Sequence, residues 1–214
     1  MLDIIPQCSH KWIHSLISLQ IPKTASSSLN LCLGERNLLY KHRGLFQEKF
    51  GKHPLYRGVF DVRHAVPEHI FSLLGRQVND YFSFAVIRKT IDRIASAYRF
   101  GKDKKLWSVY GLAENTSADE FVDWLYQGFK NKRKDVLILL PQSTWTHSPI
   151  FRPNVILKFE NLVNEWQKML ADYQIQGLPP LSHENKSSGI VEFSQESVEK
   201  LFDIYSEDGY VNNP

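Results

Sequence analysis

The segment IPKTASSSL, residues 21–29, constrains the fold of this chain more than any other stretch. It follows the apolar run Leu16–Leu19 and predicts a buried strand, a tight loop and the start of a helix. Backbone N–H groups at a helix N-terminus lack acceptors within the helix, and the helix dipole adds positive potential there. Because Lys23 adds a full charge to the loop, the segment predicts a cradle for a phosphate group.

Hydroxyl side chains follow the lysine closely and add hydrogen-bond donors. The predicted cradle comprises Lys23, Thr24, Ala25, Ser26, Ser27 and Ser28, which bind through side chains and backbone. The segment lacks the glycines and the terminal Gly-Lys-Ser/Thr of a Walker A loop. An ordinary nucleoside triphosphate bound through Mg²⁺ is therefore not the expected ligand.

The size and composition of the chain favour one globular domain. Its 214 residues suit a single domain over 1–214, and a hydrophobic fraction of 43% is ample for a packed core. The net charge of +3 is compatible with an anionic ligand but too small to indicate a nucleic acid partner. With only Cys8 and Cys32, a disulfide framework is not expected, and we interpret Cys32 as a small core residue.

The compartment is predicted from features that the sequence lacks. No stretch reaches the length of a membrane span, and the N-terminus has neither the basic nor the apolar region of a secretory signal. We therefore expect a cytoplasmic protein, or a protein of the Golgi lumen if an N-terminal anchor has been trimmed from it. No His, Cys and Asp cluster has the spacing of a metal site, so no metal is expected.

Strands and helices alternate along the chain. Strands are predicted over 15–21, 57–62, 81–87 and 155–159, and helices over 27–34, 67–74, 90–100, 117–128, 161–173 and 195–205. The segment 81–87 is nearly all apolar, which is typical of a strand buried on both faces of a parallel sheet. The predicted fold class is α/β, with a P-loop-like, mainly parallel central sheet flanked by helices. Ligands of such sheets bind beyond the carboxyl ends of the strands.

Residues 84–100, FAVIRKTIDRIASAYRF, contain a second anion-binding pattern. Arg88 ends a buried strand, and Arg93 and Ser96 lie one turn apart on the following helix. An arginine fork and a hydroxyl placed this way can clamp a phosphate, although Arg93 could instead pair with a carboxylate. Two phosphate sites on neighbouring strands predict a ligand with two separated phosphates.

These two motifs resemble those of a known enzyme family. IPKTASSSL resembles the 5′-phosphosulfate loop, and IRKTIDRIASAY the 3′-phosphate motif, of sulfotransferases that use 3′-phosphoadenosine 5′-phosphosulfate (PAPS). The most similar branch contains the heparan and chondroitin sulfotransferases and bacterial relatives. Further segments resemble that branch in the same order, from about residue 15 to residue 210: RHAVPEHIFSLLG, LLPQSTW, LKFENL, LPPLSHENKSS and IYSEDGY. Lys89 and Thr90 depart from the family's usual Asp or Asn and Pro.

The resemblance implies transfer of a sulfuryl group from PAPS to a hydroxyl acceptor, with a carbohydrate as the expected acceptor. Lys23 would stabilise the leaving 5′-phosphate, and His64 would act as general base, with Asp61 and His69 as alternatives. Arg88 and Ser96 would hold the 3′-phosphate. The late loop, through Lys186, Ser187 and Ser188, would close over the nucleotide.

Several assignments stay open at this point. Gln142 and Trp145 are candidates for the acceptor cleft, Glu160 for anchoring a loop, and Phe159 for the core or for stacking on adenine. The basic runs 102–105 and 130–134 are either solvated faces or a surface for an acidic glycan. A non-catalytic relative that binds a nucleotide or an anionic glycan is one alternative function. A P-loop-like small-molecule kinase is another, although it should carry a Walker lysine and serine and a Mg²⁺-binding carboxylate.

Overall fold

Three parallel strands form the sheet in the computed structural model, which describes residues 15–56, 62–133, 135–181 and 190–208. The strands β1 (Leu16–Leu19), β2 (Phe82–Ile87) and β3 (Val155–Lys158) lie in the order β1-β2-β3. Leu16 pairs with Phe82, and Phe84 pairs with Val155. Because all strands run in one direction, the loops that follow them meet at the same edge of the sheet.

The central strand is buried on both faces. Phe82, Phe84 and Val86 belong to one apolar cluster, whereas Ala85 between them belongs to the cluster on the opposite face. This alternation with a period of two is the pleat of a strand, and it explains why residues 81–87 are almost uniformly apolar.

Helices cover both faces of the sheet. Helices α1 (Ser26–Leu33) and α9 (Leu162–Asp172) contribute residues such as Leu29 and Trp166 to the cluster with Phe84. The opposite face packs against helices that contribute Leu39, Phe46, Ile70 and Trp145. These are α2 (Leu38–Lys41), α3 (Arg43–Phe50), α4 (Pro67–Leu74) and α8 (Ser143–Thr146).

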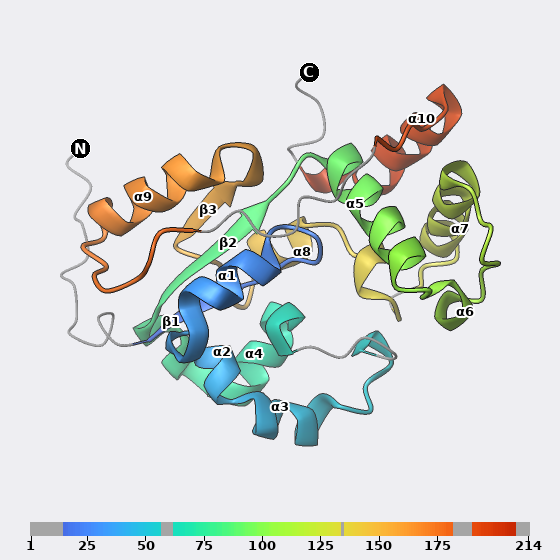
Figure 1. Ribbon diagram of the computed structural model, residues 1–214. Helices are drawn as coiled ribbons and strands as arrows, with labels where there is room; N and C mark the ends of the chain where they lie inside the picture. The colour runs from blue at the N-terminus through green and yellow to red at the C-terminus, as the bar shows by residue number, and fades with distance from the viewer. Residues whose placement is uncertain (1–14, 57–61, 134, 182–189, 209–214) are drawn as a thin grey trace.

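A third apolar cluster lies beyond the carboxyl edge of the sheet, where Figure 1 shows the remaining helices gathered at the end of β2. These are α5 (Thr90–Asp103), α6 (Trp107–Tyr110), α7 (Ala118–Lys130) and α10 (Gln195–Ile204). Ile94, Trp107, Phe121 and Leu201 form the centre of this cluster. In the described ranges, every helix falls short of the length and apolarity that a membrane span requires.

Short 3₁₀ segments connect these elements. They are η2 (Gly34–Arg36), η3 (Pro54–Tyr56), η4 (Val62–His64), η5 (Gly75–Asp80), η6 (Leu137–Leu139), η7 (Phe159–Asn161) and η8 (Ser206–Asp208). The element η4 carries the predicted base, and η6 and η7 each contribute residues to the pocket described below.

The predicted α/β class with a parallel sheet flanked by helices is confirmed. The capping box at the start of α7 is also confirmed, since Ser117 Oγ accepts from Glu120 N–H and Glu120 Oε2 accepts from Ser117 N–H. Helices α5 and α7 run two or more residues further than predicted, and α2, α3, α6 and α8 were not predicted. The predicted strand 57–62 falls outside the described residues except for Val62, which begins η4.

We predict that Gly101→Ala lowers the free energy of unfolding. A Cβ at this position in α5 would lie 2.4 Å from Cζ3 of the buried Trp107 ring. Overpacking of this kind costs about 1–3 kcal/mol, partly offset by the higher helix propensity of alanine. Urea denaturation measures the change.

Gly44→Ala in α3 is the matched control, because a Cβ there meets no heavy atom within 4 Å. It should leave the stability unchanged or raise it by up to about 1 kcal/mol. Equal effects of the two substitutions would contradict the packing of α5 against α6.

Candidate active site

The loop between β1 and α1 has an unusual backbone. Lys23 (φ 71°) and Ala25 (φ 73°) both adopt the left-handed conformation, although neither is glycine. Each such residue costs about 1–2 kcal/mol relative to ordinary backbone. Left-handed residues directly before a helix turn backbone N–H groups toward one concave side, which is the geometry of an anion-binding nest. Helix α1 then begins at Ser26, as the cradle requires.

Three hydrogen bonds hold this loop in place. Thr24 is fully buried, and its hydroxyl donates to the Ile21 carbonyl at 2.8 Å. The guanidinium of Arg88 donates to the Lys23 carbonyl at 3.3 Å, and Arg93 Nε donates to the Pro22 carbonyl at 3.2 Å. The Thr24 hydroxyl, predicted as a ligand contact, is therefore used inside the loop.

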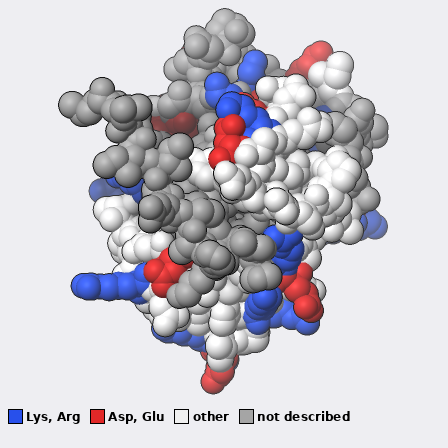
Figure 2. Space-filling model, turned by 90° about the vertical axis from the view of Figure 1, so that its left-hand side faces the viewer, with Lys and Arg blue, Asp and Glu red and all other residues white. Residues whose placement is uncertain are grey.

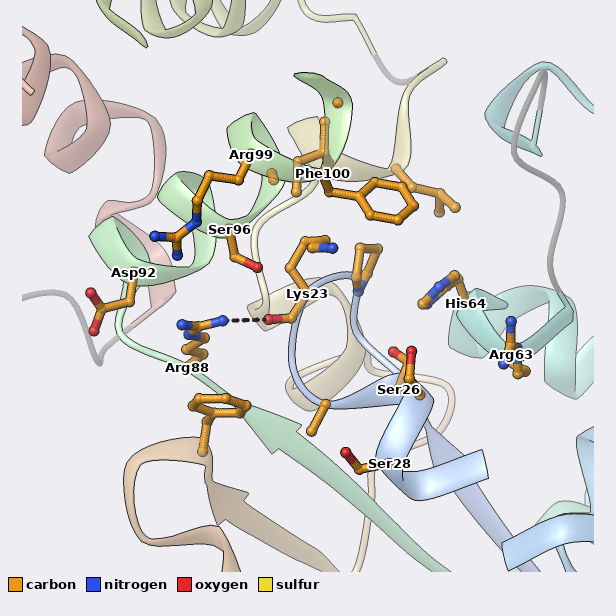
Figure 3. Close-up of a pocket in the computed structure, with 18 of the residues that line it drawn as sticks. Lys23, Ser26, Ser28, Arg63, His64, Arg88, Asp92, Ser96, Arg99 and Phe100 are labelled. Carbon is orange, nitrogen blue, oxygen red and sulfur yellow. Dashed lines mark hydrogen bonds between the residues drawn. The ribbon is translucent and has the colours of Figure 1, made fainter. Parts of the chain in front are cut away.

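A pocket of about 900 Å³ opens over this loop, at the carboxyl edge of the sheet (Figure 3). It brings together most of the residues that the sequence predicted: Lys23, Ala25, Ser26, Ser27, Ser28, His64, Arg88 and Ser96. Thr24 does not line it, and Lys186, Ser187 and Ser188 lie outside the described residues. Its volume lies toward the upper end of the range of small-molecule sites.

Lys23 stands in the middle of the pocket, with its Nζ 3.8 Å from the centroid of the Phe100 ring. Its pKa is lowered to about 8, first by burial and then by the positive charges of Arg88 and Arg99; Asp103 opposes the change. The pocket therefore holds more positive than negative charge around its central amine. A bound anion would stabilise the charged form of Lys23.

Arg88 lies beside Lys23, and its guanidinium lies 4.2 Å from the centroid of the Phe159 ring. The Gln142 side chain fixes its backbone by accepting from Arg88 N–H and donating to the Arg88 carbonyl, both at 2.9 Å. Glu160 Oε1 accepts from the next N–H, that of Lys89, at 2.8 Å. The prediction that Glu160 anchors a loop is confirmed.

Ser26 Oγ and Arg88 Nε, which belong to the two predicted anion sites, are buried without a hydrogen-bond partner in the described part of the chain, as is Trp107 Nε1 elsewhere in the pocket. Buried polar groups are nearly always satisfied in native proteins, so such a pair in a pocket indicates a site for a ligand. Both are donors, which suits an anion with several oxygen atoms.

His64, in η4, lies across Lys23 from Arg88 in the view of Figure 3. Its Nδ1 is 2.6 Å from the Gln20 carbonyl. A carbonyl oxygen can only accept, so Nδ1 carries the proton and Nε2 keeps a lone pair in the neutral ring. His64 therefore has the tautomer of a general base, held by the end of the same strand that leads into the cradle.

The alternative bases are placed differently. The ring of His69 stacks on Phe50, with centroids 4.3 Å apart, and its Nδ1 lies 2.8 Å from the Tyr56 hydroxyl. It does not line the pocket, and burial lowers its pKa. Asp61 lies outside the described residues.

The comparisons with known proteins agree with this geometry. Residues 12–210 match the model of the sulfotransferase family. The chain belongs to the sulfotransferase family. No curated protein and no solved structure matches this sulfotransferase.

Several residues that were predicted to belong to the site of the sulfotransferase do not line the pocket and instead support the surrounding structure. Gln142 and Trp145, assigned to the acceptor cleft, are both buried, and Trp145 Nε1 donates to the Ala65 carbonyl. Arg93 is also fully buried, does not line the pocket and donates to backbone carbonyls. Its charge opposes the burial that raises the pKa of the Asp208 carboxyl, which agrees with the alternative that it pairs with a carboxylate. Cys32 is a buried thiol, as predicted. The side chains of these four residues are packed in the interior or hydrogen-bonded to the backbone.

The pocket also contains residues that sequence reasoning missed: Arg63, Asp92, Arg99 and Phe100. A signal for two of them exists in α5, because Asp92, Ser96 and Arg99 follow the i, i+4, i+7 spacing of one helix face. Among the described residues on the face shown in Figure 2, basic and acidic side chains lie close to one another. Within the described ranges, no group of three or more His, Cys, Asp or Glu side chains is arranged to hold a metal.

We predict that the Lys23 amine titrates near pH 8. Its burial and the nearby guanidinium groups lower the pKa to about 8, against about 10.4 for an ordinary lysine. Competitive acylation at a series of pH values, with peptides quantified by mass spectrometry, should show half-maximal reactivity of Lys23 near pH 8. In Arg99→Gln the midpoint should rise because one repelling charge is gone; an unchanged midpoint near pH 10 in both proteins would contradict the charge cluster.

Proposed function

We propose that this sulfotransferase moves a sulfuryl group from PAPS to a hydroxyl acceptor. The observation that carries the proposal is the pairing of two cationic sites in one pocket. The cradle of Lys23, Ser26, Ser27 and Ser28 follows β1, and Arg88 and Ser96 follow β2. Two such sites suit a nucleotide with phosphates at both its 3′ and 5′ positions.

The residues present fit that donor. Ser26 Oγ and Arg88 Nε are buried donors without partners in the described structure, one in each cationic site. We assign the cradle to the 5′-phosphate and Arg88 with Ser96 to the 3′-phosphate. The Phe159 ring, which already contacts Arg88, lies with Leu162 and Val163 on that side of the pocket and suits the adenine base.

The chemistry requires a stabilised leaving group and a proton acceptor. When bound, PAPS supplies a sulfuryl group whose bond to the 5′-phosphate breaks as the acceptor oxygen bonds to sulfur. Lys23 stabilises the negative charge that grows on the leaving phosphate. His64 Nε2, with its lone pair, accepts the proton of the attacking hydroxyl.

The bisphosphate product, 3′-phosphoadenosine 5′-phosphate, should raise the melting temperature of the protein because it binds only the native state. At about a hundredfold excess over its dissociation constant, we expect a shift of roughly 5–10 °C. AMP, which lacks the 3′-phosphate, should give a much smaller shift. The measurement is a thermal-shift titration with both nucleotides and with ATP, each with and without Mg²⁺.

Arg88→Gln tests the 3′-phosphate assignment in the same assay. It should remove most of the difference between the bisphosphate and AMP. The AMP response should fall less, and only because the Arg88 guanidinium also holds the Lys23 carbonyl of the cradle. A response to ATP that requires Mg²⁺, with none to the bisphosphate, would indicate the kinase alternative. Bisphosphate binding without transfer to any acceptor would indicate a non-catalytic relative.

His64→Ala should lower kcat by about 10²–10⁴-fold, the usual contribution of a general base. The bisphosphate affinity should change little, because His64 is assigned to the acceptor side. His147→Ala is the matched control, since His147 is exposed and lies outside the pocket. Turnover of the His64 variant within a few fold of the control would remove His64 as the base.

A further inference from the structure

One part of the pocket wall is apolar. We call it the apolar branch and define it by six side chains: Phe100, Leu106, Trp107, Tyr110, Val136 and Leu137. Phe100 is 38% exposed, and all the others except the buried Trp107 are partly exposed. Partly exposed aromatic and aliphatic side chains that converge on one cavity mark a ligand site more often than a surface without function.

The wall of the apolar branch is firmly supported. Its residues come from the end of α5, from α6 and from the segment that begins η6. Trp107, one of the six, packs in turn against Phe121 and Tyr98, with ring centroids 5.3 and 5.5 Å away. Because this cluster is the core of the helical part of the fold, the apolar branch is preformed.

The apolar branch begins at the reacting groups. Its first residue, Phe100, carries Lys23 Nζ over its ring at 3.8 Å. Figure 3 shows this ring reaching over Lys23 on the side of the pocket where His64 lies. A molecule that places its hydroxyl between Lys23 and His64 would therefore meet the apolar branch with the rest of its body.

The donor does not need this wall. Its phosphates are assigned to Arg88, Ser96 and the cradle, and its base to Phe159 with Leu162 and Val163. Phe159 contacts Arg88, whereas Phe100 at the start of the apolar branch lies against Lys23 on the side of His64 (Figure 3). The apolar branch is thus left for the acceptor.

We propose that the acceptor is an apolar alcohol or phenol, whose hydrocarbon body fills the apolar branch. This inference rests on the proposed function and replaces the expectation of a carbohydrate acceptor. Four of these six side chains carry no hydrogen-bonding group, so most hydroxyl groups of a sugar buried against them would lack partners, which is unfavourable. The acceptor oxygen bonds to sulfur as the sulfur–phosphate oxygen bond breaks, its proton passes to His64, and the products are an organic sulfate and the bisphosphate.

A binding experiment tests the acceptor class without relying on turnover. Phenols with 4-alkyl chains from methyl to butyl are titrated calorimetrically into the protein saturated with 3′-phosphoadenosine 5′-phosphate. Affinity should rise up to about fourfold per methylene, as expected for complete transfer of one methylene group out of water. The heat capacity change should be negative and grow along the series. A glucuronic acid–N-acetylglucosamine disaccharide serves as the carbohydrate probe and should bind more weakly than every phenol.

Two identical substitutions locate the site. Val136→Trp fills the apolar branch and should weaken 4-butylphenol binding at least tenfold while leaving bisphosphate affinity unchanged. Val109→Trp is the matched control, because Val109 is 50% exposed on α6 and does not line the pocket. It should change neither affinity. Circular dichroism melting of both variants checks that they fold, and the phenol series on the unsubstituted protein decides the acceptor class without them.

The outcomes separate the two proposals. If the bisphosphate does not bind, the proposed function and the apolar acceptor both fail. If it binds and the alkyl series is flat, or the disaccharide binds more tightly than the phenols, only the apolar acceptor is wrong. If folded Val136→Trp and Val109→Trp bind 4-butylphenol equally, the apolar branch is not the acceptor site.

Discussion

The site depends on two hydrogen bonds from arginine side chains to the carbonyls of consecutive loop residues, Pro22 and Lys23. The left-handed backbone at Lys23 and Ala25 costs about 2–4 kcal/mol together. Hydrogen bonds from charged donors contribute about 1.5–3 kcal/mol each, enough to offset that cost. Both arginines follow β2, so the pairing of β1 with β2 brings them to the loop. The conformation of the cradle before α1 is therefore stabilised by contacts that the sheet brings together, since the residues of the cradle do not favour this conformation by themselves.

The same arrangement concentrates positive charge. Arg88 and Arg99 face Lys23 within a pocket whose burial already disfavours the charged amine, which is why the pKa of Lys23 falls. The nearby Glu160 carboxylate already accepts a hydrogen bond from the Lys89 backbone N–H. A ligand with two phosphate groups would offset this positive charge, so the protein should discriminate sharply between ligands that carry a phosphate at each cationic site and ligands that carry only one.

Sequence reasoning predicted correctly the elements that are determined by residues close together in the chain. The apolar run before the cradle, the uniformly apolar β2 and the capping box of α7 each depend on neighbouring residues, and each was placed correctly. The hydrogen bonds of individual side chains escaped prediction: the Thr24 hydroxyl donates to the nearby Ile21 carbonyl, and Gln142 pairs with the backbone of Arg88 from 54 residues away. No periodicity reports such contacts. Helices α2 and α3 were missed because they are short or largely exposed, and short helices are stabilised by packing more than by propensity.

Helix α5 contributes residues to both ends of the pocket, so the spacing of its polar and aromatic residues bears on the proposed function. Ser96 and Arg99 point toward the side of the pocket where Arg88 lies, which is the proposed phosphate side, whereas Phe100 begins the apolar branch. Gly101 then lets Trp107 approach so closely that a Cβ would not fit, which fixes α6 and the far wall. The proposed phosphate and acceptor sites thus lie on consecutive turns of one helix, with Lys23 at their boundary against the Phe100 ring. Substitutions near Phe100 that reshape the proposed acceptor end therefore also change the environment of the amine that is proposed to stabilise the leaving group.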